Sequence, residues 1–195
     1  MQTQSMKDAA NSLMFCTDGK RRHIVLFYEN ENSALDIKCQ FISTALSNRE
    51  YCIFLTAKSV RWIEKALRDY GIDVHNLKKD GVLDIHKVTW PEDAGKTDYD
   101  IEKVKGFLCQ KPQVSKRIVG FHTTDATVKH DVDAGISIEQ YCKSIFGDIN
   151  CSMLCSHYVK KFPLKERARW MVEMLKIHDS AIFVDKKGLN QVIEL

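Results

Sequence analysis

Hydrophobic positions along the chain follow two patterns that alternate with each other. Short, largely apolar runs occur at residues 23–28, 51–57, 117–123, 151–158 and 181–185, and a further run with polar interruptions occurs at residues 82–88. Runs of this kind are typical of strands that are buried on both faces, as in a parallel sheet. Between most of these runs, apolar residues recur at a spacing near 3.6, which is typical of helices that bury one face. The helices predicted in this way cover residues 34–46, 60–70, 101–108, 138–146 and 164–175.

The alternation of strands and helices predicts an α/β fold, in which a mostly parallel central sheet is flanked by helices. Ser33 is the expected N-cap of the first helix, and Gly71 is expected to end the second. Residues 192–193 are expected to close a C-terminal hairpin. No repeat or linker-like tract divides the chain, so we expect one domain over residues 21–195, preceded at residues 1–20 by an N-terminal arm or short helix.

The composition is that of a globular protein, with 195 residues of which 44% are hydrophobic and 28% charged. The 29 basic and 26 acidic residues are mixed along the chain and leave a net charge of +3, which does not predict a nucleic-acid-binding protein. Neither a membrane span nor a signal peptide is recognisable, so we expect a cytoplasmic protein that does not contact a membrane. The seven cysteines are then expected to be free thiols.

The loop after the first predicted strand lies where nucleotide-binding α/β domains carry a phosphate-binding loop. It has no glycine and no lysine, and it carries Glu29 and Glu31, whose charges would repel phosphate. The two glutamates either contact a polar or cationic ligand or are solvated charges at a helix N-terminus. Residues 95–97, Gly-Lys-Thr, resemble the end of a phosphate-binding motif, but Trp90 stands where its first glycine belongs. We therefore do not expect a nucleotide to bind at either place.

Further polar residues lie where ligands of open α/β sheets usually bind, beyond the carboxyl ends of the strands. The loop at residues 122–127 is rich in hydroxyl groups and also contains His122 and Asp125. Its hydroxyl groups either cap a turn or contribute to a ligand site, and Asp125 is a candidate ligand of Mg²⁺. Residues 130–133 offer another alternative for a metal site.

Alternation along the strand at residues 151–158 places Cys151, Cys155 and His157 on the same side. A zinc site is one interpretation, although the chain has no paired Cys-x2-Cys knuckles. A Cys–His nucleophile pair is another, although no orienting acid is evident. We expect Cys151 to be a core residue, and Cys155, His157 and the neighbouring Tyr158 to line a pocket. His178 is interpreted as a cap at the C-terminus of a helix.

The first part of the chain resembles a known architecture. The strand at residues 23–28, the helix that ends near residues 46–50 and the strand at residues 51–55 are similar to the opening of a KaiC/RecA-like domain. A first strand that holds a histidine and ends in Tyr28, without a phosphate-binding loop, further resembles the MEDS domain. MEDS is the sensory domain of methanogens and methylotrophs that is named after the dichloromethane regulator DcmR.

The later part of the chain continues this resemblance. The sequence Cys155-Ser-His157-Tyr158 and the helix that ends at His178 are similar to the C-terminal motifs of the MEDS family, so the resemblance covers about residues 22–187. It implies a RecA/KaiC-like three-layer sandwich. It also implies a prokaryotic protein that senses small hydrocarbon derivatives, often beside a histidine kinase or a DNA-binding module. This chain carries neither module, so we expect a stand-alone sensor with a separate histidine kinase or transcription regulator as its partner.

Together these observations predict a non-enzymatic sensory domain that binds a small molecule and signals to a partner protein. We expect no metal and no cofactor, and a homo-oligomer is an open alternative to a monomer. The competing predictions are a degenerate RecA/KaiC-like scaffold or assembly subunit, and a nucleotide-binding ATPase. The predicted ligand pocket lies at the carboxyl edge of the sheet and is lined by Tyr28, Glu29, Glu31, His122, Cys155, His157 and Tyr158.

Overall fold

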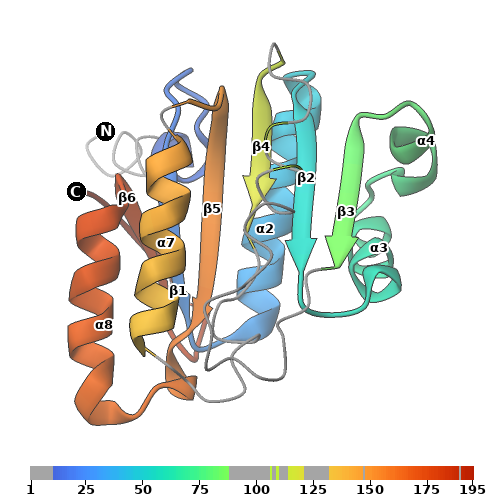
Figure 1. The fold of residues 1–195 in the computed structure, drawn as a ribbon. Helices are drawn as coiled ribbons and strands as arrows, with labels where there is room; N and C mark the ends of the chain where they lie inside the picture. Colours follow the sequence, from blue (N-terminus) through green and yellow to red (C-terminus); the bar gives the residue numbers. More distant parts are fainter. Residues whose placement is uncertain are drawn as a thin grey trace, which may run out of the picture.

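The computed structural model describes residues 11–87, 106, 109, 114–120, 132–146, 148–188 and 190–195. A seven-stranded sheet forms the centre of the molecule, with the strand order β3-β2-β4-β5-β1-β6-β7 (Figure 1). The strands are β1 (His23–Tyr28), β2 (Tyr51–Thr56), β3 (Leu83–Lys87), β4 (Lys116–Val119), β5 (Cys151–Tyr158), β6 (Ser180–Val184) and β7 (Asn190–Glu194). All neighbouring strands are parallel except β6 and β7, which form the antiparallel pair at the end of the chain.

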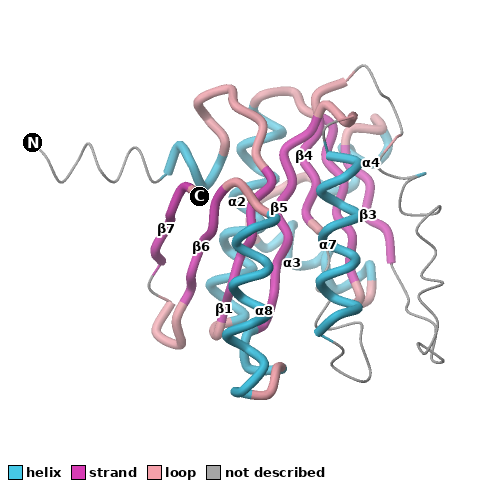
Figure 2. The backbone as a smooth tube through the Cα atoms, turned by 60° about the vertical axis from the view of Figure 1, so that its left-hand side comes forward, coloured by secondary structure: helices cyan, strands magenta, loops and turns pink. Residues whose placement is uncertain are grey.

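Helices cover both faces of the sheet. Residues 11–15 are helical. The helices that follow are α2 (Glu31–Ser47), α3 (Val60–Asp69), α4 (Val74–Lys79), α7 (Val132–Phe146) and α8 (Leu164–Ile177), with a short 3₁₀ turn η1 (Val159–Lys161) before α8. Figure 1 shows α7 and α8 in front of the sheet and α2 behind it. Figure 2, turned by 60°, shows β3 and β7 at the two edges. No helix in the described ranges is long and apolar enough to cross a membrane.

Alternation along the strands divides the core between the two faces. On β1, Ile24 and Leu26 pack in the cluster with Phe41 of α2, whereas Val25 and Phe27 pack in the cluster with α8. All six side chains of β1 are buried, because a central strand of a parallel sheet has a covered face on each side. This double burial is the physical reason why the strands appear in the sequence as continuous apolar runs.

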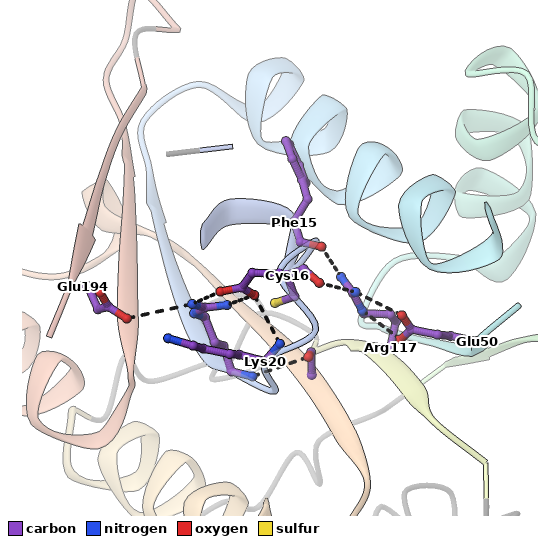
Figure 3. A network of polar contacts seen from close by, with 9 residues as sticks. Phe15, Cys16, Lys20, Glu50, Arg117 and Glu194 are labelled. Carbon is purple, nitrogen blue, oxygen red and sulfur yellow. Dashed lines mark hydrogen bonds and ion pairs between the residues drawn. The ribbon is translucent and has the colours of Figure 1, made fainter. Parts of the chain in front are cut away.

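The segment before β1 is held at the amino end of the sheet by polar contacts (Figure 3). The buried guanidinium of Arg117 makes two hydrogen bonds to the carboxylate of Glu50, at 2.9 and 3.0 Å. It also donates to the backbone carbonyls of Phe15 at 2.5 Å and of Cys16 at 3.2 Å. Arg22 likewise contacts both carboxylate oxygens of Asp18 at 2.6 Å. Residues 14–16 are buried as a result, so the chain packs on the core before the first strand begins.

The α/β architecture, the mostly parallel sheet and the C-terminal hairpin confirm the sequence prediction. Helix α3 ends before Gly71, as expected, and that glycine has a φ of 91°. The prediction of Ser33 as N-cap is wrong, because the side chain of Asn30 accepts the hydrogen bond from the Ser33 amide. Helix α4 was not predicted: it is short and buries only Val74, so it leaves no apolar stripe. The helix predicted at residues 101–108 lies almost entirely outside the described residues.

Candidate functional site

A pocket opens at the carboxyl edge of the sheet, on the face that α2 and α3 cover. It is a small cavity of about 40 Å³ that is partly open to solvent. The carboxyl ends of β1, β2 and β4 contribute to it, which is where open α/β sheets usually bind ligands. Its lining combines aromatic and aliphatic side chains with lysine, glutamate and hydroxyl groups: Tyr28, Glu31, Asn32, Leu35, Lys38, Phe54, Thr56, Lys58, Trp62, Ile63 and Gly120.

Lysines decide the electrostatics of this carboxyl-edge pocket. Lys58 forms an ion pair with Glu31 at 3.3 Å, and its ammonium also lies 4.4 Å from the centre of the Trp62 ring. The ammonium of Lys38, a buried side chain on α2, lies 5.1 Å from the centre of the Tyr28 ring. The pocket therefore contains two lysines and one glutamate, and that glutamate is already paired.

Ion pairs with lysines change the prediction, made from the loop sequence, that Glu29 and Glu31 give this edge a negative charge. Glu31 contacts Lys58, and Glu29 contacts Lys160 at 3.4 Å. Both lysines lie far along the chain from the loop that they neutralise, so the loop sequence alone suggested a negative site. The negative charge expected of the loop is therefore balanced by two lysines.

The described residues predicted to form one pocket separate into two places. Tyr28 and Glu31 line the carboxyl-edge pocket, and the ring of Tyr158 lies tilted against that of Tyr28 on the same face, with ring centres 5.5 Å apart. Glu29 lies at this edge, paired with Lys160, but does not line the pocket. His122 lies outside the described residues.

Cys155 and His157 lie on the opposite face of the sheet, beneath α7 and α8, and both are buried. The prediction that they share a pocket with Tyr28 therefore differs from the structure. The physical reason is alternation along β5: Tyr158 and His157 are neighbours in sequence, and so their side chains point to opposite faces. The predicted placement of Cys151, Cys155 and His157 on one side agrees with the structure.

A buried polar cluster surrounds Cys155 and His157. Glu139 of α7 is at its centre, and the cluster as a whole comprises His23, Glu139, Cys155, His157 and His178. We call this set the histidine–glutamate cluster. One carboxylate oxygen of Glu139 lies 3.1 Å from Nε2 of His157. The other lies 3.5 Å from Nε2 of His178 and 3.9 Å from Nε2 of His23. The Sγ of Cys155 lies 3.3 Å from Nε2 of His23.

Four elements place these side chains together. His23 begins β1, and its backbone amide donates a 2.8 Å hydrogen bond to the carboxylate of Asp179, directly after α8. His178 is the C-cap residue of α8, and its Nδ1 lies 2.7 Å from the backbone carbonyl of Met174. Parallel pairing of β1 with β5 sets Val25 beside Cys155, which brings the Cys155 thiol next to the start of β1.

Aromatic rings enclose the histidine–glutamate cluster. Phe146 of α7 stacks on His23 with ring centres 5.4 Å apart. Trp170 of α8 meets the His157 ring edge-on at 5.1 Å and is itself fully buried. His23 and His178 face each other with ring centres 4.0 Å apart. The cluster is thus a polar island inside an apolar layer, where unpaired charge is costly.

This environment perturbs the ionisable groups. Burial, followed by the nearby His178, holds the pKa of His23 well below its usual value, which favours the neutral imidazole. Burial tends to raise the pKa of Glu139, but the imidazoles of His157 and His178 outweigh it and hold that pKa well below the usual range. Burial and the charge of Glu139 raise the pKa of the Cys155 thiol well above its usual value. The cluster therefore contains one stable buried carboxylate.

Sequence reasoning missed His23 and Glu139 as site residues and treated His178 only as a cap. Glu139 stands three residues before Cys142 and seven before Phe146, so it lies on the same stripe of α7 that packs against the sheet. A charged residue on the buried stripe of a helix indicates a buried polar partner, because charged residues are rarely fully buried without one. The structure was needed to show that its partners are three histidines.

Comparison with protein families decides how the chain is classified. The family model described as MEDS, the MEthanogen/methylotroph, DcmR Sensory domain, matches residues 22–178. The chain belongs to the MEDS family. The family is one of sensory domains, and this confirms the predicted sensory character of the chain. No curated protein matches the chain.

The matched range of the MEDS domain includes every residue of the carboxyl-edge pocket and of the histidine–glutamate cluster. Both sites therefore belong to the sensory domain itself.

Proposed function

We propose that this MEDS domain is a non-enzymatic sensor that binds a small organic molecule in the carboxyl-edge pocket and passes the signal to a partner protein. The single observation that supports this most is the pocket itself. It lies where α/β folds bind ligands, and it combines an apolar wall with a few polar groups that converge on it. The membership in a sensory family agrees with such a role.

The lining favours a ligand with an apolar body and an anionic or hydrogen-bond-accepting head. Phe54, Ile63 and Trp62 supply apolar contact area. Lys38 and the Thr56 hydroxyl supply donors at the same pocket. Short carboxylates and small alcohols have this combination, and they are oxygenated members of the hydrocarbon derivatives that the family is thought to sense.

Signal output is proposed to run through the outer wall of the pocket. Trp62 of α3 lines the pocket and still exposes 42% of its surface, so one side chain faces both the ligand and the solvent. A ligand that packs against Trp62 alters the surface of α3 that a histidine kinase or transcription regulator would contact. The ligand must therefore bind the conformation of the domain with the altered α3 surface more tightly than the conformation without it.

A thermal-shift screen tests the binding function. The panel contains short carboxylates, alcohols, halocarbons and amines, with ATP and Mg²⁺ included as a separate arm. A ligand at a hundredfold excess over its Kd stabilises the folded state by about 2.7 kcal/mol. That corresponds to a rise in Tm of about 5–11 °C for a domain of this size.

The control variants separate the pocket from general effects. Lys38→Met keeps the length of the side chain and removes the charge from the pocket, so it is expected to reduce the shift given by an anionic hit. Lys65→Met removes an exposed lysine of α3 and is expected to leave the shift unchanged. Stabilisation by ATP and Mg²⁺ alone would contradict the proposal and favour a nucleotide-binding protein. A panel without any hit, together with a stable oligomer by light scattering, would favour a scaffold.

A further inference from the structure

We propose that the histidine–glutamate cluster binds a divalent transition-metal ion, and that Zn²⁺ fits it best. The four ligands are His23, Glu139, Cys155 and His178. Their ligand atoms all lie within 4.8 Å of one another, and all four residues are buried. The sequence alone led us to expect no metal, because the chain has no paired Cys-x2-Cys knuckles. Three of the four ligands lie on elements other than the strand that carries Cys155.

Three of the six distances between the ligand atoms are close to those of a tetrahedral site. Bonds of about 2.0–2.3 Å from Zn²⁺ to nitrogen, oxygen and sulfur place neighbouring ligand atoms about 3.3–3.6 Å apart. In the cluster, Cys155 Sγ lies 3.3 Å from His23 Nε2, and Glu139 Oε2 lies 3.5 Å from His178 Nε2. The pair of His23 Nε2 and Glu139 Oε2 is at 3.9 Å. Side-chain movements of less than about 1 Å close the remaining gaps.

The tautomer of His178 is set by its backbone contact. Its Nδ1 lies 2.7 Å from the carbonyl oxygen of Met174, which can only accept a hydrogen bond, so Nδ1 carries the proton. In the neutral ring, Nε2 then presents a lone pair toward the carboxylate of Glu139. A histidine that donates one ring N–H to a backbone carbonyl and offers the other nitrogen to a metal is the usual outer-shell arrangement of zinc sites.

Acceptor atoms converge at this point without a matching donor. Within the described residues, Glu139 Oε2 and His178 Nε2 make no hydrogen bond. The oxygen and the His178 nitrogen face each other at 3.5 Å, and both are buried. Two buried acceptors at this separation repel unless a cation lies between them, either a proton on the imidazole or a metal ion. The thiol of Cys155 and a second imidazole at the same point favour the metal.

The charge of the four ligands matches a divalent ion. A thiolate and a carboxylate supply two negative charges, and two neutral imidazoles supply none, so the complex with Zn²⁺ is neutral. A neutral complex suits a site enclosed by Phe146 and Trp170, where net charge is costly. The donor set of sulfur, two nitrogens and one oxygen suits Zn²⁺ better than Mg²⁺ or Ca²⁺, which prefer oxygen ligands.

His157 acts as a positioning residue for this site. Its Nε2 contacts Glu139 Oε1 at 3.1 Å, which leaves Oε2 directed at His23 and His178. Partners that orient a metal ligand in this way typically change metal affinity about 10- to 100-fold when they are replaced. His157 is therefore expected to affect affinity without being a ligand.

The metal proposal is independent of the proposed sensing function, because the two sites lie on opposite faces of the sheet. They approach each other at Gly120, which lines the pocket and whose added Cβ would lie 3.3 Å from Cys155 Sγ. Either proposal can therefore fail alone, and their tests use different variants and different readouts.

The test measures metal directly on the full chain, purified without an affinity tag and without chelating resin. Elemental analysis gives the metal content after loading with Zn²⁺ and exhaustive dialysis. Substitution with Co²⁺ gives an absorption spectrum in which a thiolate-to-cobalt charge-transfer band reports the Cys155 bond. We expect one Zn²⁺ per chain and a thiolate band in the cobalt protein.

Matched variants assign the ligands. Cys155→Ala is expected to remove the thiolate band and to weaken Zn²⁺ binding at least tenfold, and His178→Gln to weaken binding likewise. Cys151→Ala, on the same face of β5 but outside the cluster, is expected to change neither readout. His157→Gln is expected to keep the band and weaken binding about 10- to 100-fold.

A wild-type protein that retains no stoichiometric Zn²⁺ and shows no thiolate band with Co²⁺ overturns the proposal. It would show that the cluster is a protonated imidazole–carboxylate pair. Retention of the band in Cys155→Ala would overturn it equally. Circular dichroism checks the fold of each variant, and the wild-type stoichiometry decides the question even if a variant does not fold.

Discussion

Replacing Arg117 by methionine is expected to destabilise the protein strongly, because this residue joins three parts of the chain at one buried point. Its side chain is 2% exposed and makes a two-pronged contact with Glu50, whose side chain is 12% exposed. It also satisfies the carbonyls of Phe15 and Cys16. The variant leaves a largely buried carboxylate and two carbonyls without their donor.

The magnitude follows from this burial. Removing one partner of a buried ion pair typically costs about 3–5 kcal/mol. For a domain of 150–250 residues, each kcal/mol lowers Tm by about 2–4 °C, so we expect a loss of about 6–20 °C. Thermal unfolding followed by circular dichroism measures it, with denaturant unfolding as a second estimate of the free energy.

Two controls make this reasoning refutable. Asp69→Ala breaks the Lys65–Asp69 pair, which is shorter than the Arg117–Glu50 pair, at 2.5 Å, but 62–70% exposed. It is expected to change stability by less than about 1 kcal/mol. Adding Glu50→Gln to Arg117→Met is expected to recover part of the loss, because it removes the uncompensated charge. Similar losses for the buried and the exposed pair, or no recovery in the double variant, would refute the argument from burial.

The remaining predictions concern the cysteines and the contact between the two sites. Cys109 is exposed, whereas burial raises the pKa of Cys39 to about 11 and that of Cys52 to about 12. Iodoacetamide is therefore expected to label Cys109 first in the native protein. Mass spectrometry of the digested protein checks the order, and early labelling of Cys52 would contradict it. Gly120→Ala adds a methyl group 3.3 Å from Cys155 Sγ and 3.4 Å from a backbone oxygen, so it is expected to cost about 1–3 kcal/mol. A variant as stable as the wild type in denaturant unfolding would show that the sheet moves aside without strain.

The fold was predictable from the sequence because its strongest signals are local. Strands buried on both faces appear as unbroken apolar runs, and α8 and α3 carry their apolar residues on one stripe. Helix α4 gave no such signal, because six residues with one buried side chain have no periodicity. The cap at Asn30 was misassigned by three positions, since asparagine and serine are both good N-caps and only the geometry distinguishes them.

The sites were less predictable, because they depend on contacts between residues distant in sequence. Glu31 is paired with Lys58, and Glu139 contacts histidines from three other elements. Each of these histidines lies alone in its own segment. Sequence reasoning found the carboxyl-edge location of Tyr28 and the shared side of Cys155 and His157, since strand alternation determines both. It could not place α7 over β1 and β5, which is what completes the cluster.

The central claim is that the carboxyl-edge pocket binds a small organic molecule. Isothermal titration calorimetry tests it most directly, with the strongest compound of the thermal-shift screen titrated into the wild-type protein, Lys38→Met and Lys65→Met. The account predicts one site per chain in the wild type, an affinity at least tenfold weaker in Lys38→Met, equivalent to about 1.4 kcal/mol, and no change in Lys65→Met. Equal affinities in all three proteins would contradict it, because the compound would then bind away from the pocket.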